Sequence, residues 1–561
     1  MMEAPPVPLD ALPRTELPPE ASPADRAFVE LEQRVVHQLF SFSPASAVQL
    51  GLHAYDGRVP DYSPAAVARY HQGLDTLDRE LEAVSEGELS PSARVDWELL
   101  KLQIASEQFN LDELKVLDRF PHAYVDGLQL VPYMARDYAP AETRAAAMVQ
   151  VLRAVPSVLG EARRRLKDPL GAPLVQVSQA MAAGLAPHYL DAEHWIARES
   201  PGSLTEYRRA REAAEDEVRR FEERLEEARR HATDAFALGP ARFQRLLYVR
   251  EGLELPWEEL RQIGEEDLHR NQSRLAGIAH SLRPPREPGA AIAELWGDHP
   301  TAEGLLSEAK AYTEELRRFV REKGFVSLPT PEHCRVEETP PVSRAWTTAS
   351  LDPPGPFERE AYEGVYHVTP VEPNWDPKRQ REWLESFNRP LLRNITAHEV
   401  YPGHYLQLLH FRRQARSLTR RTYLSAAFVE GWAHYSELLV IEEGYGGGAP
   451  PAEMAQLHDA LLRDCRLLAS IDMHCRGRSV AEATALFEGQ AHMGHFPAER
   501  EALRGTFNPE YFCYTLGKLE ILRARERYRV KHPGCRPREF HDRLLSLGAP
   551  PVGWIDRLLA A

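Results

Sequence analysis

Residues 394–407 read NITAHEVYPGHYLQ, and this stretch carries the strongest functional pattern in the chain. His398 and Glu399 stand together as in the zinc-binding H-E-x-x-H motif, whose two histidines, four residues apart, lie on one helix face. Here the next histidine is His404, six residues after His398. Because a regular helix has 3.6 residues per turn, six residues would set the two imidazoles roughly 120° apart around the axis. The two side chains could not share an ion on an undistorted helix.

The sequence between the two histidines contains residues that distort a helix. Pro402 lacks an N–H, and its ring clashes with the carbonyl four residues back, that of His398. Gly403 permits backbone conformations that are closed to other residues. We therefore predict that the helix breaks or widens over 401–403 and that His404 swings back toward His398. The alternative is a helix that ends at Pro402 beside two incidental histidines, and the spacing alone does not choose between the two.

A second segment, FVEGWAHYSE at 428–437, supplies candidate carboxylates. Glu430, His434 and Glu437 have the spacing of residues that share one helix face. The apolar residues around them predict a buried helix, in which a carboxylate needs a metal or a cation as its partner. Two imidazoles from the first segment together with Glu430 would form a zinc site with one position left for water. The alternative is that Glu430 and Glu437 are solvated or paired with other side chains.

Two later segments add polar side chains of the kind that assist hydrolysis. Residues 464–474 read DCRLLASIDMH, and residues 508–525 read NPEYFCYTLGKLEILRAR. On a helix, Tyr511, Tyr514 and Lys518 share a face. Such groups can polarise an amide carbonyl or hold a tetrahedral oxyanion. Taken alone, a tyrosine stripe at this spacing more often indicates core packing.

Composition and charge exclude several other classes of function. The chain has 561 residues, with 68 basic and 84 acidic side chains and a net charge of −16. This balance argues against general nucleic-acid binding and against a polybasic membrane anchor. The five cysteines form no C-x-x-C pair, which argues against a disulfide framework or a cysteine-based zinc site. No secretory signal and no apolar run of about 18 residues are visible, so we expect a cytoplasmic protein without a membrane span.

The pattern along the chain predicts a mainly α-helical protein with a small inserted β-sheet. Residues 1–27 are proline-rich and acidic and indicate a mobile arm or a surface strap, while 28–561 indicate one large helical domain. Residues 203–232 place glutamates and arginines around an apolar stripe, which is typical of a long amphipathic helix with a solvated face. Short β-type runs predict strands at 325–328, 345–348 and 365–369.

The four segments together resemble a large bacterial family, long catalogued as a domain of unknown function, whose signature is HE-x-x-PGH-x-x-Q. Later runs match the family's EGWA-x-Y-x-E and Y-x-x-G-K-x-x-I elements, and an aspartate–histidine element is present more loosely at 472–474. The resemblance covers most of the chain, from about residue 28 to residue 559. The matching residues are His398, Glu399, Pro402, Gly403, His404, Gln407, Glu430, Gly431, Trp432, Ala433, Tyr435, Glu437, Tyr514, Gly517, Lys518 and Ile521.

The resemblance implies a metallopeptidase-like zinc protein. Its fold would be similar to that of neurolysin, angiotensin-converting enzyme and carboxypeptidase Taq, with a long, deep cleft between helical halves. Zn²⁺ would be bound by His398, His404 and Glu430, with water in the fourth position. Glu399 would act as the general base that takes the proton of this water and returns it to the leaving amine.

The resemblance also implies roles for side chains around the metal. Tyr514 would stabilise the oxyanion, and Lys518 would assist it or bind a substrate carboxylate, so both are candidate catalytic residues. Tyr511 and His474 are candidate substrate-binding residues.

Further residues would support this site from outside. Glu437, Asp472 and His474 would orient the metal ligands. The predicted strand at 365–369 would offer an edge to an extended peptide. His434 falls where relatives usually carry an apolar residue, and it receives no metal role.

Other functions remain open on this pattern. A zinc hydrolase of a non-peptide amide or ester would use the same metal site with a different pocket. A non-catalytic metal- or peptide-binding protein is disfavoured by Glu399, because a pure binder needs no base beside its ligand. A helical interaction scaffold is supported only by the charged helix at 203–232. The sequence favours a peptidase acting on a peptide or small amide, and it predicts no oligomeric state.

Overall fold

Serine caps and prolines set the starts of several helices. Ser22, Ser63 and Ser90 each precede a proline at the first helical position, and each side-chain oxygen accepts a hydrogen bond from the backbone N–H three residues later. Over the described residues the chain is mainly helical with a small sheet, as predicted, and no helix there is long and apolar enough to cross a membrane. The computed structural model describes residues 6–329, 333–344, 347–360, 363–414 and 416–560.

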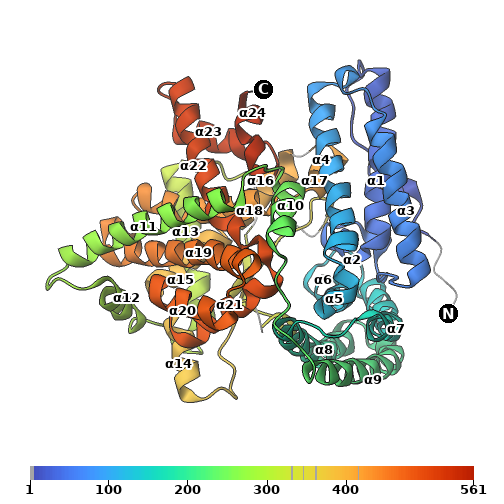
Figure 1. The fold of residues 1–561 in the computed structure, drawn as a ribbon, viewed down its shortest axis with the longest axis horizontal. Coiled ribbons are helices and arrows are strands. Elements are labelled where there is room, and N and C mark those ends of the chain that lie inside the picture. Colours follow the sequence, from blue (N-terminus) through green and yellow to red (C-terminus); the bar gives the residue numbers. More distant parts are fainter. Residues whose placement is uncertain (1–5, 330–332, 345–346, 361–362, 415, 561) are drawn as a thin grey trace.

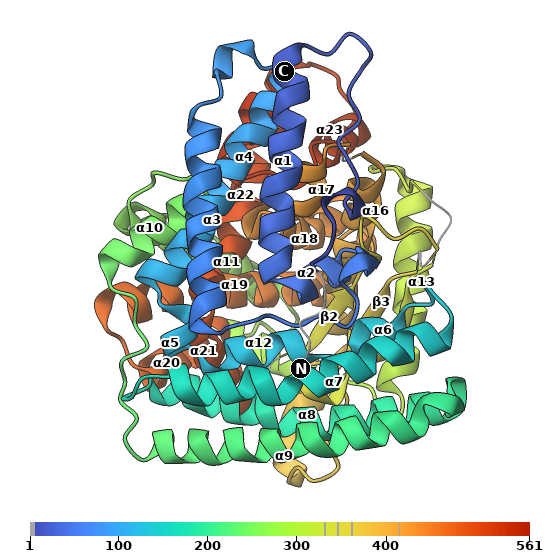
Figure 2. The same cartoon turned by 90° about the vertical axis from the view of Figure 1, so that its right-hand side faces the viewer.

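The first nine α-helices form an N-terminal body with a hydrophobic core of its own (Figure 1). They are α1 (Pro23–Phe42), α2 (Pro44–Gln49), α3 (Pro64–Glu82), α4 (Pro91–Gln108), α5 (Val116–Arg119), α6 (Val131–Ala135), α7 (Ala141–Arg165), α8 (Ala172–Glu199) and α9 (Leu204–Arg229). Helices α7, α8 and α9 lie across one end of α1, α3 and α4 (Figure 2). Helix α9 buries Tyr207, Phe221 and Leu225 while most of its charged side chains face solvent, which confirms the predicted amphipathic helix.

The described part of the proline-rich arm lies against α1. Val7 and Leu12 are buried in the core of the N-terminal body. The side-chain amide of Gln33 donates hydrogen bonds to the carbonyls of Leu9 and Leu12, at 3.1 and 3.0 Å. This part of the arm is therefore a strap, and residues 1–5 lie outside the described residues.

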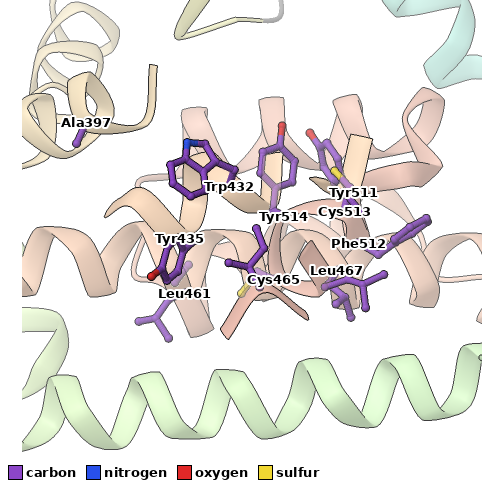
Figure 3. Close-up of a cluster of buried hydrophobic side chains, with 14 of the residues drawn as sticks. Ala397, Trp432, Tyr435, Leu461, Cys465, Leu467, Tyr511, Phe512, Cys513 and Tyr514 are labelled. Atoms are coloured by element: carbon purple, nitrogen blue, oxygen red, sulfur yellow. The ribbon is translucent and has the colours of Figure 1, made fainter. Parts of the chain in front are cut away.

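The remaining helices and the sheet form a C-terminal body around a second hydrophobic core. Figure 3 shows part of this core, which includes Trp432, Leu467 and Tyr514. The helices are α10 (Pro240–Glu251), α11 (Trp257–Ser281), α12 (Pro288–Trp296), α13 (Leu305–Lys323), α14 (Pro377–Glu385), α15 (Arg389–Glu399), α16 (His404–Gln414), α17 (Leu418–Thr422), α18 (Ala426–Glu442), α19 (Pro450–Arg476), α20 (Val480–Ala491), α21 (His495–Phe507), α22 (Cys513–Lys531), α23 (Pro537–Leu545) and α24 (Ile555–Ala560). Helix α19 is buried along most of its length and packs against α11, α15, α18, α20, α21 and α22.

Three short strands form a mixed sheet next to α15. The strands are β1 (Arg335–Glu338), β2 (Ala349–Asp352) and β3 (Val365–Val368), in the order β1-β3-β2. Strand β3 is parallel to β1 and antiparallel to β2, with Tyr366 opposite both Val336 and Leu351. The predicted strand at 365–369 is confirmed. The prediction that it offers a free edge is wrong, because β1 and β2 cover both of its edges.

The other two predicted strands differ from the structure. Residues 325–328 form no strand, because α23 takes their polar groups: Asp542 accepts from the backbone N–H of Ser327 at 2.9 Å, and a ring nitrogen of His541 lies 2.7 Å from the carbonyl oxygen of Phe325. The predicted strand at 345–348 begins on residues 345–346, which lie outside the described residues. The strand observed nearby starts at Ala349.

Helices α18 and α22 cross in backbone contact at two glycines. A Cβ atom on Gly517 would lie 1.8 Å from the carbonyl oxygen of Ala427, and one on Gly431 would lie 2.4 Å from the backbone of Gly517. Real Cβ atoms do not approach backbone atoms so closely, so only glycine fits at this crossing. The contact sets the spacing between the helices that carry Glu430 and Tyr514.

We expect Gly517→Ala to destabilise the protein by about 1–3 kcal/mol, because the added methyl group forces α18 and α22 apart. Gly489→Ala is the matched control, since a Cβ on Gly489 within α20 meets no atom within 4 Å. The control should leave stability unchanged or raise it by up to about 1 kcal/mol. Urea unfolding of the three proteins measures the difference, and equal midpoints for the two variants would contradict the close crossing.

Candidate metal centre

The helix that carries His398 ends where the sequence predicts a break. Helix α15 runs to Glu399, and α16 begins at His404. In the intervening turn, the N–H of Gly403 donates to the carbonyl of Ala397 at 2.9 Å. A Cβ atom on Gly403 would lie 1.7 Å from the carbonyl oxygen of His398. The predicted break is confirmed, and it requires glycine because the turn folds back onto the end of α15.

The turn brings His398 and His404 to a common carboxylate. Their ring centroids are 4.8 Å apart, and the ring planes are 87° apart. The Nε2 atoms of His398 and His404 lie 3.4 and 3.3 Å from the same oxygen, Oε2 of Glu430 on α18. These three residues, His398, His404 and Glu430, are called the metal group below.

The metal group has the donor types and spacing that a zinc ion needs. One possible ligand atom from each residue lies within 4.8 Å of the others. Zinc–ligand distances of about 2.0–2.1 Å place two ligands of a tetrahedral ion roughly 3.3 Å apart, close to the two separations observed. Oε2 of Glu430 is buried and has no hydrogen-bond partner among the described residues. A cation between the carboxylate and the two imidazoles would satisfy this oxygen.

Electrostatics keep Glu430 in the form that binds a cation. Burial alone would raise the pKa of Glu430, but His404 and His398 outweigh it and hold that pKa well below its usual range. Burial lowers the pKa of His398, whereas its interactions with Glu430 and Glu437 raise the pKa overall, to about 9. Glu430 is therefore a carboxylate ready to bind a cation, and metal binding would release the proton of His398.

Glu437 contacts Nδ1 of His398, the ring nitrogen that does not face Glu430. Its Oε1 atom lies 2.7 Å from Nδ1 of His398 and 3.3 Å from the guanidinium of Arg463. Its Oε2 atom lies 3.2 Å from Nδ1 of His434, which is not part of the metal group. Burial would raise the pKa of Glu437, but Arg463 and His434 hold it well below its usual range. An ionised carboxylate on Nδ1 turns Nε2 of His398 toward Glu430, which is the orienting role that the sequence predicted.

The metal group opens into a cavity of about 510 Å³, a size typical of small-ligand sites. Glu399 and Tyr514 also line this cavity. The Tyr514 ring lies 6.4 Å from the ring of His398, with an interplanar angle of 27°. Burial and the nearby Glu430 raise the pKa of Tyr514 above its usual range, so the hydroxyl keeps its proton.

Within the described residues the cavity is lined by the C-terminal body, and the expected cleft between helical halves stays a prediction. All of the described lining residues fall between Trp296 and Tyr514. The two bodies meet around a smaller cavity of about 360 Å³, which is lined by residues of both bodies and by no member of the metal group. The metal group therefore depends on the packing of α15, α16, α18, α19, α21 and α22. The N-terminal body contacts the lining of the cavity at Pro353, whose carbonyl accepts a hydrogen bond from Arg136 at 3.1 Å.

Two predicted site residues on or near α22 do not reach the cavity. Lys518 is buried, and its Nζ donates to Asp267 on α11 at 2.6 Å. Tyr511 lies in the turn before α22, and its hydroxyl is 3.2 Å from a carboxylate oxygen of Glu501. Neither is among the described residues that line the cavity. Lys518 faces α11 instead of sharing the direction of Tyr514, so the predicted catalytic role of Lys518 and binding role of Tyr511 have no support in the geometry.

Two predicted residues at the end of α19 also lie away from the cavity. A ring nitrogen of His474 is 2.9 Å from the carbonyl oxygen of Gly505, and Asp472 pairs with Arg261 at 2.8 Å. Helix α19 lines the cavity as far as Arg466, and a helix rises about 1.5 Å per residue. His474, eight residues later, is therefore roughly 12 Å farther along the axis. Neither residue is placed to bind substrate or to orient a metal ligand.

The cavity has a basic wall that was not predicted from the sequence. Arg463 and Arg466 on α19 and Arg500 and Arg504 on α21 line it. Arginine is common throughout the chain, and the local spacing of these four resembles that of surface arginines. Only the packing of α19 against α21 brings them together.

The fold and the metal group define a large helical protein with a buried His-His-Glu site inside its C-terminal body. Residues 44–559 match the family model described as bacterial protein of unknown function (DUF885), and the chain belongs to this family. The predicted resemblance to a bacterial family of unknown function is thus confirmed. No curated protein matches the chain.

Two solved structures share the fold. A candidate lipoprotein of unknown function from Shewanella oneidensis is 22% identical, with a TM-score of 0.77, and the match covers 95% of this chain and 100% of that chain. A candidate lipoprotein from Colwellia psychrerythraea is 17% identical, with a TM-score of 0.80, and the match covers 96% and 98% of the two chains. At these identities the likeness concerns the fold alone.

Replacement of His404 by alanine removes one of the three donors, and we expect zinc affinity to fall at least about tenfold. His495→Ala is the control, because His495 is exposed on α21 and lies outside the lining of the cavity. Equilibrium dialysis followed by elemental analysis measures bound zinc in both variants. Equal zinc content in the His404→Ala variant and the parent would exclude His404 as a ligand.

Proposed function

We propose that this protein is a zinc-dependent hydrolase and that it acts as a peptidase on short peptides. The observation that carries the proposal is the metal group, in which two imidazole nitrogens and a carboxylate oxygen lie within 4.8 Å of one another at a cavity of about 510 Å³. Two imidazoles and one carboxylate, with a position open to water, are the donor set of catalytic zinc sites. Structural zinc sites are closed by four protein ligands.

The residues around the cavity have separate tasks in this proposal. His398, His404 and Glu430 hold the ion, and Glu437 fixes the ring of His398. Bound zinc supplies a water molecule whose pKa falls toward ~7. Glu399 accepts a proton from the attacking water and returns it to the leaving amine nitrogen. One peptide bond and one water molecule give one carboxylate and one amine, and Glu399 ends in the state in which it began.

In this proposal Tyr514 stabilises the carbonyl oxygen of the substrate. Its ring lies beside His398, and its hydroxyl oxygen accepts a hydrogen bond from the guanidinium of Arg504 at 3.4 Å. The hydroxyl hydrogen is therefore free to donate to an oxygen that gains negative charge. The positive charge of Arg504 behind the hydroxyl strengthens this donation.

A free strand edge favours a peptide as the substrate. Ala349, Ser350 and Leu351 of β2 line the cavity, and β2 pairs with β3 along one edge only within the described residues. An extended peptide can add to such an edge through its main-chain groups. The lining also includes Trp296 and Trp383, which suit an acylated small molecule, so a non-peptide amide or ester is the second candidate.

The cellular compartment is also a proposal. The sequence favours the cytoplasm, whereas the descriptions of the two solved relatives as candidate lipoproteins favour the cell envelope. Fractionation of the producing bacterium, followed by detection of the protein with an antibody, separates the two locations. Recovery in the envelope fraction would overturn the cytoplasmic assignment.

Glu399→Gln removes the base and keeps the shape of the side chain. We expect zinc content to stay at the parent level and kcat on a mixed set of short peptides to fall at least about 100-fold. Mass spectrometry of the products measures hydrolysis. Glu488→Gln on the exposed side of α20 is the control and should match the parent. If Glu399→Gln retains zinc and cleaves as fast as the parent, the assigned base is wrong.

Tyr514→Phe removes one hydroxyl from the cavity. We expect kcat to fall about 100-fold while zinc content and KM stay near the parent values, because the hydroxyl acts on charge that develops in the transition state. Tyr511→Phe is the matched control, since its hydroxyl lies outside the cavity, and it should keep the parent kcat. Steady-state kinetics of both variants would refute the role of Tyr514 if their kcat values were equal.

A further inference from the structure

One wall of the cavity next to the metal group is formed by four arginines. Arg463 and Arg466 come from α19, and Arg500 and Arg504 lie one turn apart on α21. The guanidinium of Arg504 lies 3.4 Å from the hydroxyl oxygen of Tyr514, whose ring faces the metal group. Positive charge is therefore concentrated beside the place where a scissile bond would lie.

Two of these arginines are already paired with carboxylates. Arg466 forms a two-pronged ion pair with Glu501, with both nitrogen–oxygen distances at 2.7 Å. Arg463 lies 2.6 Å from Asp459 and 3.3 Å from Glu437. Their charges are balanced within the protein, so they are not available to a substrate anion.

Arg500 and Arg504 have no carboxylate within ion-pair distance among the described residues. Arg500 donates to the carbonyl of Arg344 at 3.2 Å and lies 4.9 Å over the ring of Trp383. Arg504 binds the tyrosine hydroxyl described above and lies 5.5 Å over the ring of Tyr511. Burial lowers the pKa of Arg500 to about 10, although the nearby Glu501 acts in the opposite direction. Burial also acts to lower the pKa of Arg504, but Tyr511, Tyr514 and Glu501 outweigh it and raise that pKa above its usual range.

The other carboxylates of the lining do not neutralise these two arginines. Glu399 and Glu430 lie at the metal end of the cavity. Glu382 and Glu385 come from α14, where Glu382 lies 3.6 Å from Lys378. Two half-buried guanidiniums on aromatic rings, facing a cavity, thus form a site for an anion supplied from outside.

We propose that Arg500 and Arg504 bind the C-terminal carboxylate of a peptide substrate, so that the enzyme releases a short fragment from the C-terminal end. This inference rests on the proposed peptidase function and narrows its substrate class. Two guanidiniums one helical turn apart present forked N–H donors that match the two oxygens of a carboxylate.

The volume of the cavity and the short distance from Arg504 to the metal group favour a C-terminal carboxylate over an acidic side chain as the bound anion. A cavity of about 510 Å³ accommodates a short stretch of peptide, and a C-terminal end bound inside it can reach the arginines of its wall. The hydroxyl of Tyr514 lies 3.4 Å from the guanidinium of Arg504, and the ring of Tyr514 lies 6.4 Å from the ring of His398. Because an extended chain advances roughly 3.3 Å per residue, the cleaved bond lies within a few residues of the bound carboxylate.

The test measures binding in the full-length Glu399→Gln protein, in which peptides stay intact. Calorimetry compares N-acetylated tetrapeptides of alanine and phenylalanine that carry either a free C-terminal carboxylate or a C-terminal amide. We expect the free acids to bind at least about tenfold more tightly. Arg500→Met and Arg504→Met should each remove most of this preference, Arg504→Lys should keep part of it, and Arg478→Met, on the surface beside Glu482, should keep all of it.

Three outcomes would overturn the proposal. These are equal binding of acid and amide peptides, a preference that survives both methionine variants, and tighter binding of an amidated peptide with an internal aspartate, which would assign the arginines to an acidic side chain. Because the readout is binding, it is independent of turnover. If the protein prefers peptide acids but cleaves no peptide, the hydrolase proposal is refuted and the carboxylate site is kept. If the parent cleaves acids and amides equally well, the carboxylate site is refuted and the hydrolase proposal is kept.

Discussion

The backbone contact between Gly403 and the end of α15 is the constraint on which the candidate site depends. Two imidazoles six residues apart diverge on a regular helix. The turn at Pro402 and Gly403 instead returns the second ring to within 4.8 Å of the first, measured between centroids. Glu430 then faces both rings with a buried oxygen that no described group satisfies. One local departure from helical geometry brings the two imidazoles together, and the packing of α18 adds the carboxylate.

The rest of the C-terminal body holds this ligand set in place. The glycine crossing of α18 and α22 sets the distance between Glu430 and Tyr514, and Glu437 fixes the ring of His398 through a buried ion pair with Arg463. The buried charges of Glu437 and Arg463, on the side of His398 away from Glu430, are thus paired with each other. The exceptions lie on the cavity side, where a metal ion and a substrate anion would complete the pairing.

The parts of this arrangement that depend on short-range geometry could be predicted from the sequence. The clash of Pro402 with the preceding turn, the shared face of Glu430 and Glu437, and the amphipathic helix at 203–232 all follow from local rules. Lys518 could not be placed in the same way, because the face it occupies also meets Asp267 from α11, far away in sequence. The order of the strands and the basic wall likewise arise from contacts between distant segments.

Anomalous diffraction from a crystal grown with zinc, recorded on both sides of the zinc absorption edge, tests the central claim most directly. The account predicts one strong peak about 2.0–2.2 Å from Nε2 of His398, Nε2 of His404 and a carboxylate oxygen of Glu430. A peak at other residues, or no peak while these three side chains point away from one another, would contradict it.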